Sequence, residues 1–294
     1  MLRLPAHTIG AIHAPEKAMH DPRVPETLEG WCLLHQMFRI RWQAWEALPA
    51  AERRARAAET VAAINGMNRG QESTTALSTL LGHKGDLMFI HFRQSFEALQ
   101  EAQIALARLP LAPFLEPLAS YVSVLELGMY EMTGIIHARL GERGLKTGSE
   151  EFEQAFDAEM EEQKKRVLPR LFLELPRRRY VCFYPMNKRR GEERNWYGLS
   201  FEERAQLMRE HGMVGRHYAG AVTQMISGSI GFDDWEWGVD LFADDPVTFK
   251  KLVYEMRFDQ ATVWYGEFGS FWTGLQFSAS ELPAYLDGAV PRLV

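Results

Sequence analysis

A tyrosine and several cations lie close together in the stretch Cys182-Phe183-Tyr184-Pro185-Met186-Asn187-Lys188-Arg189-Arg190. On an extended strand the side chains alternate between faces, so Tyr184, Met186 and Lys188 point to the same side. A lysine ammonium binds carboxylates, and the fork of an arginine suits them particularly well. With Arg170, this stretch concentrates positive charge in a chain whose formal net charge is -6. It suits a carboxylate-bearing ligand, although most Lys-Arg runs are solvated surface.

His211 is the histidine best placed to bind a metal. It follows a helix that we predict over residues 200–210, and from a helix end an imidazole can reach a cavity beside a sheet. A neutral imidazole is a common metal ligand. The plainer alternative, which the local sequence alone favours, is a histidine stabilised by the helix macrodipole. Among the other histidines, His217 is the next candidate for a metal ligand. His7, His13 and His20 lie in an irregular N-terminal stretch.

Other kinds of chemistry have no motif in this sequence. It contains no glycine-rich phosphate loop, HExxH, GxSxG or Cys-His zinc pattern. Its two cysteines, Cys32 and Cys182, lie in apolar strand-like runs and form no CxxC motif, which fits a reducing compartment. The net negative charge argues against a protein whose main role is to bind along nucleic acid or an anionic membrane surface. Because neither a signal peptide nor a membrane-spanning stretch is recognisable, we expect a cytoplasmic protein.

Two similar series of elements position these residues. The first half predicts a strand, a helix, a hairpin around Gly82-His83-Lys84-Gly85-Asp86, a helix and a strand, over residues 31–40, 42–64, 74–81 with 87–92, 96–109 and 121–127. The second half predicts the same order over residues 180–186, 200–210, 218–226 with 236–243, a helix opened by Pro246, and 262–273. Ser200 and Glu203 have the spacing of a capping box.

The repeated βαββαβ order predicts an α+β fold of two tandem ferredoxin-like units with antiparallel sheets, of the dimeric α+β barrel type. We predict an N-terminal arm over residues 1–29, a first unit with a connecting segment over 30–165, and a second unit over 166–294 that carries the site. The connecting segment, residues 135–165, is expected to be helical in its later part.

Several motifs together resemble the coproheme decarboxylases of the chlorite dismutase-like superfamily. The most specific is Tyr-Pro-Met-x-Lys-Arg-Arg at Tyr184, which stands at the matching distance from His211 and Gln224. The resemblance is strongest from Arg170 to Phe271. It implies the oxidative decarboxylation of two propionates of iron coproporphyrin III to vinyl groups, which gives haem b with hydrogen peroxide as the oxidant. It also implies a homopentamer and a transient contact with a ferrochelatase.

The resemblance implies a role for each matching residue. His211 would be the axial ligand of the haem iron. Tyr184 would be oxidised and would then remove hydrogen from the β-carbon of a propionate, while Lys188 would bind a propionate and exchange a proton. The other matching residues would contact the porphyrin: Arg170, Met186, Trp196, Gln224, Thr262 and, from the first half, Tyr121. Thr262 stands where relatives usually carry serine, so the hydroxyl is kept.

Other functions remain open at this stage. Gln224 stands where chlorite-degrading members carry an arginine, and a neutral amide cannot hold an oxyanion in the same way, which disfavours a chlorite dismutase-like haem enzyme. A haem-binding or haem-delivery protein with weak peroxidase activity would need His211 but neither Tyr184 nor Lys188. A cofactor-free ferredoxin-like dimer would make His211 incidental and would leave Met186 and Trp196 as ordinary core.

Overall fold

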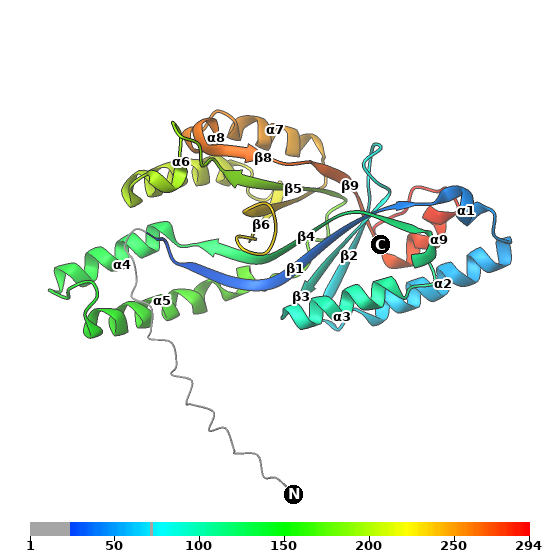
Figure 1. Cartoon of the computed structure of the whole chain (residues 1–294), viewed down its shortest axis with the longest axis horizontal. Coiled ribbons are helices and arrows are strands. Elements are labelled where there is room, and N and C mark those ends of the chain that lie inside the picture. The colour runs from blue at the N-terminus through cyan, green and yellow to red at the C-terminus, as the bar shows by residue number, and fades with distance from the viewer. Residues whose placement is uncertain (1–23, 71–72) are drawn as a thin grey trace, which may run out of the picture.

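The computed structural model describes residues 24–70 and 73–294, which form an α+β fold around one antiparallel sheet (Figure 1). Most of the predicted N-terminal arm, residues 1–23, lies outside the described residues, and the first strand begins within the rest of it. The strands are β1 (Thr27–Ile40), β2 (Thr74–Thr79), β3 (Leu87–Arg93), β4 (Leu115–Gly128), β5 (Tyr180–Lys188), β6 (Val222–Gly228), β7 (Trp237–Ala243), β8 (Gly266–Phe268) and β9 (Trp272–Phe277).

The helices flank these strands in the order that the repeat predicts. They are α1 (Trp42–Glu46), α2 (Ala50–Gly66), α3 (Phe96–Ala107), α4 (Tyr130–Glu142), α5 (Glu150–Leu171), α6 (Phe201–His217), α7 (Val247–Met256), α8 (Gln260–Tyr265) and α9 (Leu282–Leu286), with short 3-10 turns η2 (Ala112–Phe114), η3 (Trp196–Gly198) and η4 (Ala279–Glu281). In the part of the chain that the structure describes, no helix is long and apolar enough to cross a membrane.

The two halves share one closed sheet. Its strand order is β7-β6-β4-β1-β3-β2-β9-β5-β8, and β7 also pairs with β5, so the sheet closes into a barrel from which β8 extends. Two short seams join the halves, one between β4 and β6 at Val124 and Gly228, and one between β2 and β9 at Leu77 and Phe277. The predicted α+β class and antiparallel ferredoxin-like architecture are confirmed.

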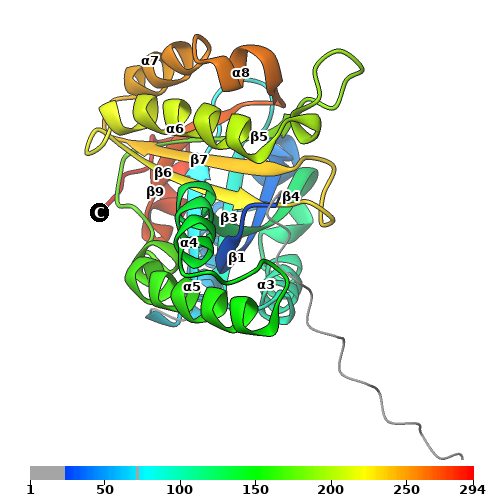
Figure 2. The ribbon, with the colours of Figure 1, turned by 90° about the vertical axis from the view of Figure 1, so that its left-hand side faces the viewer.

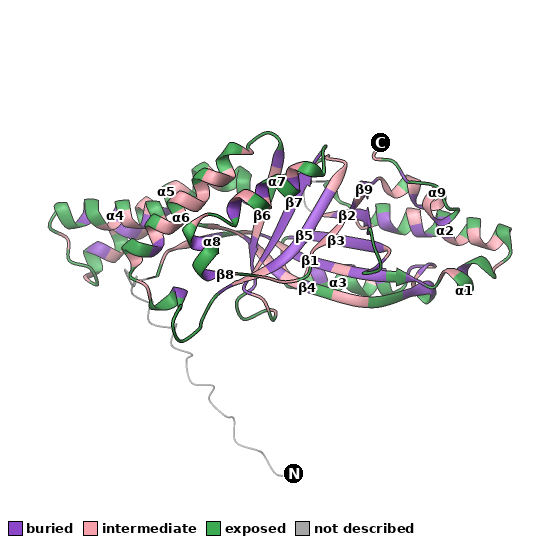
Figure 3. Cartoon of the chain, turned by 90° about the horizontal axis from the view of Figure 1, so that it is seen from above, coloured by how far each residue is buried: buried purple, intermediate pink, exposed green. Residues whose placement is uncertain are grey.

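Alternation along the strands separates the barrel interior from its helix-covered outside. Phe183 of β5 and Phe242 of β7 belong to the interior core, whereas Tyr184 and Leu241 pack outward. Helices α6 to α8 lie over one side of the barrel and α3 and α5 over the other, while α4 stands between α6 and α5 (Figure 2). Buried residues are concentrated in the strands and on the inward stripes of the helices (Figure 3).

Three predicted elements were wrong in detail. The helix expected over residues 42–64 is split at Pro49, whose ring cannot continue a helix interior, into α1 and α2. The strand expected over 262–273 begins instead as α8, because the Asp259 side chain caps a helical turn by accepting from the Thr262 amide. Helix α6 continues beyond Glu210 to His217. In addition, α5 runs through the predicted unit boundary at 165/166.

Candidate functional site

Strand β5 presents the predicted chemistry on its outer face. Cys182, Tyr184 and Met186 all pack toward the helices, and Lys188 at the end of the strand is buried with 6% of its surface exposed. The two-residue period therefore puts the phenol and the ammonium on one side of the sheet, as the spacing predicts.

Tyr184 lies in an aromatic pocket with 3% of its surface exposed. Its ring stacks on Phe271 at 4.5 Å between centroids and 25° between planes, and Phe268 lies 5.8 Å away. Burial raises the pKa of the Tyr184 phenol, the neighbouring Cys182 adds to this, and the positive charge of Arg257 opposes it. The phenol is therefore neutral at physiological pH, and oxidising it must remove a proton together with an electron.

His211 lies inside α6 rather than at its end, so the macrodipole explanation does not apply. Its Nδ1 lies 3.1 Å from Oδ2 of Asp259, which also accepts a hydrogen bond of 2.8 Å from the Thr262 hydroxyl. Burial works against the ionised form of Asp259, but the hydrogen bonds from His211 and Thr262 outweigh it and keep the pKa of this carboxyl below its ordinary value. A carboxylate that accepts from Nδ1 fixes the tautomer in which Nε2 carries a lone pair, the arrangement typical of metal-ligating histidines.

The strand face beneath α6 is incompletely buried. Gln224 of β6 is exposed, and Ile226 and Met186 on the same face are only half-buried, although α6 lies over this part of the barrel (Figure 2). A Cβ atom on Gly215 would be in ordinary van der Waals contact with the end of Met256 at 3.4 Å and with Oε1 of Gln224 at 3.8 Å, so α6 faces Gln224 at this glycine. His211 precedes Gly215 by one turn and shares its helix face. His211 and Gln224 therefore lie on the facing surfaces of α6 and β6, and we call the region between these two residues the slot.

Lys188 lies at the end of β5, next to Trp196. Its Nζ lies 4.4 Å from the centroid of the Trp196 ring, which is itself buried in η3. Burial lowers the pKa of Lys188 to about 8, and the nearby carboxylates of Asp259 and Glu236 oppose that shift. Because Asp259 acts on both His211 and Lys188, the axial-ligand candidate and the ammonium share one carboxylate.

The three remaining predicted porphyrin contacts, Tyr121, Arg170 and Thr262, do not belong to the strand face that carries Tyr184. Tyr121 lies inside the barrel, on the face of the sheet opposite to Tyr184, with its ring 5.4 Å from Phe183 and its hydroxyl donating to the Trp235 carbonyl, because β4 turns this position inward. Arg170 is exposed in the last turn of α5 and makes no hydrogen bond with the other predicted residues in the described part of the chain. Thr262 is buried in α8, with its hydroxyl bound to Asp259.

The sequence argument assigned no role to three residues that the structure brings into the site. Asp259 orients His211, Glu236 accepts a hydrogen bond of 2.8 Å from the Lys188 amide, and the Arg257 guanidinium lies 5.3 Å from the Phe268 ring beside Tyr184. All three lie between Arg170 and Phe271, where the family resemblance is strongest. An acidic or basic residue within that stretch was the available signal.

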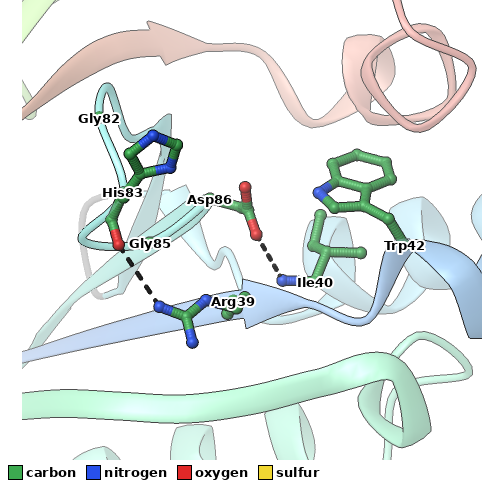
Figure 4. Close-up of a pocket in the computed structure, with 7 residues that line it drawn as sticks. All are labelled: Arg39, Ile40, Trp42, Gly82, His83, Gly85 and Asp86. Atoms are coloured by element: carbon green, nitrogen blue, oxygen red, sulfur yellow. Dashed lines mark hydrogen bonds between the residues drawn. The ribbon is translucent and has the colours of Figure 1, made fainter.

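A cavity of about 320 Å³ elsewhere in the molecule does not match this chemistry (Figure 4). It is lined by Arg39, Ile40, Trp42, Gly82, His83, Gly85 and Asp86, at the tip of the β2–β3 hairpin. Among the residues that line it, only the Arg39 guanidinium is a permanent cation, too few for a ligand with several carboxylates.

Known proteins resemble the chain over most of its length. Residues 51–277 match the family model described as chlorite dismutase. The coproheme decarboxylase of Staphylococcus saprophyticus is 42% identical over 259 residues, which cover 86% of this chain and 94% of that protein. Proteins of Natronomonas pharaonis and Haloquadratum walsbyi, both named "Putative heme-binding protein", are 44% and 40% identical over 90% and 92% of this chain. The chain spans only 42% and 48% of their lengths.

Solved structures agree with the sequence relatives. A heme-binding protein from Thermus thermophilus superposes with a TM-score of 0.76 at 39% identity, over 91% of this chain and 99% of that one. Chlorite dismutase from Candidatus Nitrospira defluvii in complex with imidazole superposes with a TM-score of 0.66 at 19% identity, over 88% and 95% of the two chains, which shows the shared fold. Since the family model covers well over half of its residues, this chain belongs to the chlorite dismutase family.

Proposed function

We propose that this protein decarboxylates two propionates of iron coproporphyrin III oxidatively, with hydrogen peroxide, to give haem b. The observation that carries the proposal is the buried Tyr184 on the same strand face as Lys188, beside the slot between His211 and Gln224. The similarity to the coproheme decarboxylase of Staphylococcus saprophyticus supports it. Iron coproporphyrin is here a substrate and haem b a product.

The residues present fit such a substrate. His211 would bind the iron through Nε2, because Nδ1 is engaged by Asp259. Gln224 would face the opposite side of the porphyrin as a neutral amide. The bound iron would supply the oxidising chemistry, with hydrogen peroxide as the oxidant. Arg257 and Lys188 would offer positive charge to the carboxylates on either side of Tyr184.

Tyr184 and Lys188 would act on the propionate itself. The phenol loses an electron and a proton, and the resulting radical takes a hydrogen atom from the β-carbon. Loss of a second electron and of carbon dioxide leaves the vinyl group, so each propionate, one hydrogen peroxide and one proton give one vinyl, one carbon dioxide and two waters. Lys188, whose pKa is lowered to about 8, is suited to exchange that proton near neutral pH.

A second candidate is a haem-binding or haem-delivery protein with weak peroxidase activity, which the names of the two longer relatives favour. The same site would then bind the porphyrin through His211 without using Tyr184.

We also propose, from the family resemblance, assembly into a homopentamer, a transient contact with a ferrochelatase and a cytoplasmic location. The division into units over residues 30–165 and 166–294 likewise remains a prediction.

One titration separates the two candidates. Iron coproporphyrin is added to the purified apoprotein, hydrogen peroxide is titrated, and the porphyrin mass is followed by chromatography. We expect the native protein to remove two carboxyl groups in succession, and Tyr184→Phe to bind but not convert. Tyr180→Phe, on the same strand, is the matched control and should convert like the native protein. Binding without loss of mass in the native protein would favour haem delivery, and no binding would exclude both candidates.

A further inference from the structure

The tip of the β2–β3 hairpin, in the first half of the chain, reaches the wall of the Tyr184 pocket in the second half. Lys84 Nζ donates a hydrogen bond of 2.8 Å to the backbone carbonyl of Phe271. Phe271 is the residue whose ring stacks on Tyr184 at 4.5 Å. We infer that Lys84 is a positioning residue for the proposed decarboxylation: it holds Phe271 in place and thereby fixes the orientation of the Tyr184 ring.

The hairpin tip is anchored on the side of β1. The Asp86 amide donates to the Phe38 carbonyl at 2.8 Å, and the Asp86 carboxylate accepts from the Ile40 amide at 2.7 Å. The Arg39 guanidinium donates to the His83 carbonyl at 3.4 Å, so both ends of the turn are tied to one strand (Figure 4). Lys84 therefore extends from a fixed support.

The same tip is also joined to the start of β9. The Leu81 amide donates to the Thr273 carbonyl at 2.9 Å. At Gly274 a Cβ atom would lie 1.6 Å from the Thr79 carbonyl oxygen, so the two backbones touch and only glycine fits. Phe271 itself precedes β9, so the strand ladder does not hold it. The Lys84 hydrogen bond supplies an anchor at this position.

The orientation of the Tyr184 ring matters for the reaction that we propose. The strand ladder of β5 fixes the backbone of Tyr184, but it leaves the side chain free to turn about its Cα–Cβ bond, which moves the phenol oxygen, and about its Cβ–Cγ bond, which turns the plane of the ring. The Phe271 ring, stacked at 25°, restrains both rotations and thereby keeps the phenol oxygen and the plane of the Tyr184 ring in place. Hydrogen transfer depends steeply on the alignment of the reacting atoms, so a looser Phe271 would slow the step without preventing substrate binding.

Ring motion tests the inference without any porphyrin. 3-Fluorotyrosine is placed at residue 184 alone, and ring flips are measured by fluorine NMR exchange in the apoprotein. We expect Lys84→Met, which keeps the side-chain length but removes the donor, to speed the flips by about tenfold, as loss of one charge-assisted hydrogen bond would. Lys84→Arg should restore the native rate, and Lys250→Met, an exposed lysine of α7, should keep it. An unchanged flip rate in Lys84→Met would overturn the inference.

Kinetics and a double mutant complete the test. Lys84→Met should lower kcat for iron coproporphyrin by about three- to tenfold while KM stays near the native value, the pattern of a lost transition-state alignment. Phe271→Leu should speed the ring flips similarly, and adding Lys84→Met to it should produce little further change, because both act through one contact. Fully additive effects would refute the coupling. A native protein that binds but does not convert coproheme would end the proposed function, while the NMR result would still decide whether Lys84 positions the ring.

Discussion

At the residue scale, the site depends on side chains that are buried together with their charges. Asp259 accepts hydrogen bonds from His211 and Thr262, and its charge also raises the pKa of Lys188. One carboxylate therefore fixes the tautomer of the metal-ligand candidate and favours the ammonium form of the lysine. Such sharing keeps the charged groups paired where water is largely excluded. Substitution of Asp259 would therefore affect both the orientation of His211 and the charge of Lys188, whereas substitution of Lys188 affects only the lysine.

Binding of coproheme should weaken as the pH rises through about 8, because burial lowers the pKa of Lys188 to about that value. Below this pH Lys188 is an ammonium that attracts a propionate, and above it the neutral amine does not, so the dissociation constant should rise by up to about tenfold per pH unit. Titrations of the apoprotein between pH 6.5 and 9.5 measure it.

Two variants assign that dependence to Lys188. Lys188→Met should bind more weakly at pH 7 and should show no rise in the dissociation constant across this window. Lys188→Arg keeps the positive charge at every pH in the window, so its affinity should stay flat. A native protein whose affinity does not change between these pH values would contradict the assignment of Lys188 to propionate binding.

At the element scale, α6 shows which geometric features of the candidate site the sequence could not predict. Ser200 and Glu203 begin the helix with a capping box, as predicted, but nothing near Glu210 ends it, and Gly212 and Gly215 lie within it. A helix tolerates single glycines when packing supports it, so local composition could not determine its end. The motifs placed His211, Gln224 and Lys188 in one site, yet the slot between α6 and β6 comes from tertiary packing.

Gly215 should control access to this slot. Because a Cβ atom there meets only the end of Met256 at 3.4 Å and Gln224 at 3.8 Å, Gly215→Ala should fold and bind normally. The longer side chain of Gly215→Leu would fill the space above Gln224, and overpacking of about 1–3 kcal/mol would weaken coproheme binding by about 5- to 150-fold. Absorbance titration measures the affinity.

The control for this substitution is Gly141→Leu in α4, where a Cβ atom meets nothing within 4 Å. It adds the same side chain to another helix and should leave coproheme affinity at the native value. Circular dichroism melting of both variants separates loss of fold from loss of the slot. Native affinity in a folded Gly215→Leu would mean that the porphyrin does not enter beside α6.

At the scale of the whole molecule, the βαββαβ repeat predicted the class of fold but not how the halves join. Periodicity identifies strands and their faces, whereas the seams at Val124 with Gly228 and Leu77 with Phe277 rest on pairings between residues far apart in sequence. Tyr121 shows the consequence, because its strand was predicted correctly while its inward face was not. A period of two distinguishes the faces but does not say which one meets the core.

A buried hydrogen-bonded pair, His35 with Asp240, links the two halves through the barrel interior. His35 Nε2 of β1 lies 2.9 Å from Oδ1 of Asp240 on β7, and both side chains are 0% exposed. Asp240 pairs in register with Phe183, the residue that precedes Tyr184 in the chain. The His35 ring stacks on Phe183 at 4.0 Å between centroids. The pair therefore joins the strand of one half to the strands that carry the site in the other.

Removing one partner of this pair should cost more than removing both. Asp240→Ala leaves His35 buried without its acceptor, and the free energy of unfolding should fall by about 3–5 kcal/mol, whereas His35→Leu with Asp240→Leu should lose much less because no polar group remains unpaired. His35 Nδ1 has no partner among the described residues, so the apolar pair sacrifices little. Urea denaturation measures these values, with Asp244→Ala, in the exposed pair with Arg178, as a control that should change little. Because the sheet is closed, each variant should still unfold in one transition. If Asp240→Ala and the double variant lost equal free energies of unfolding, the pair of His35 and Asp240 would not hold the halves together.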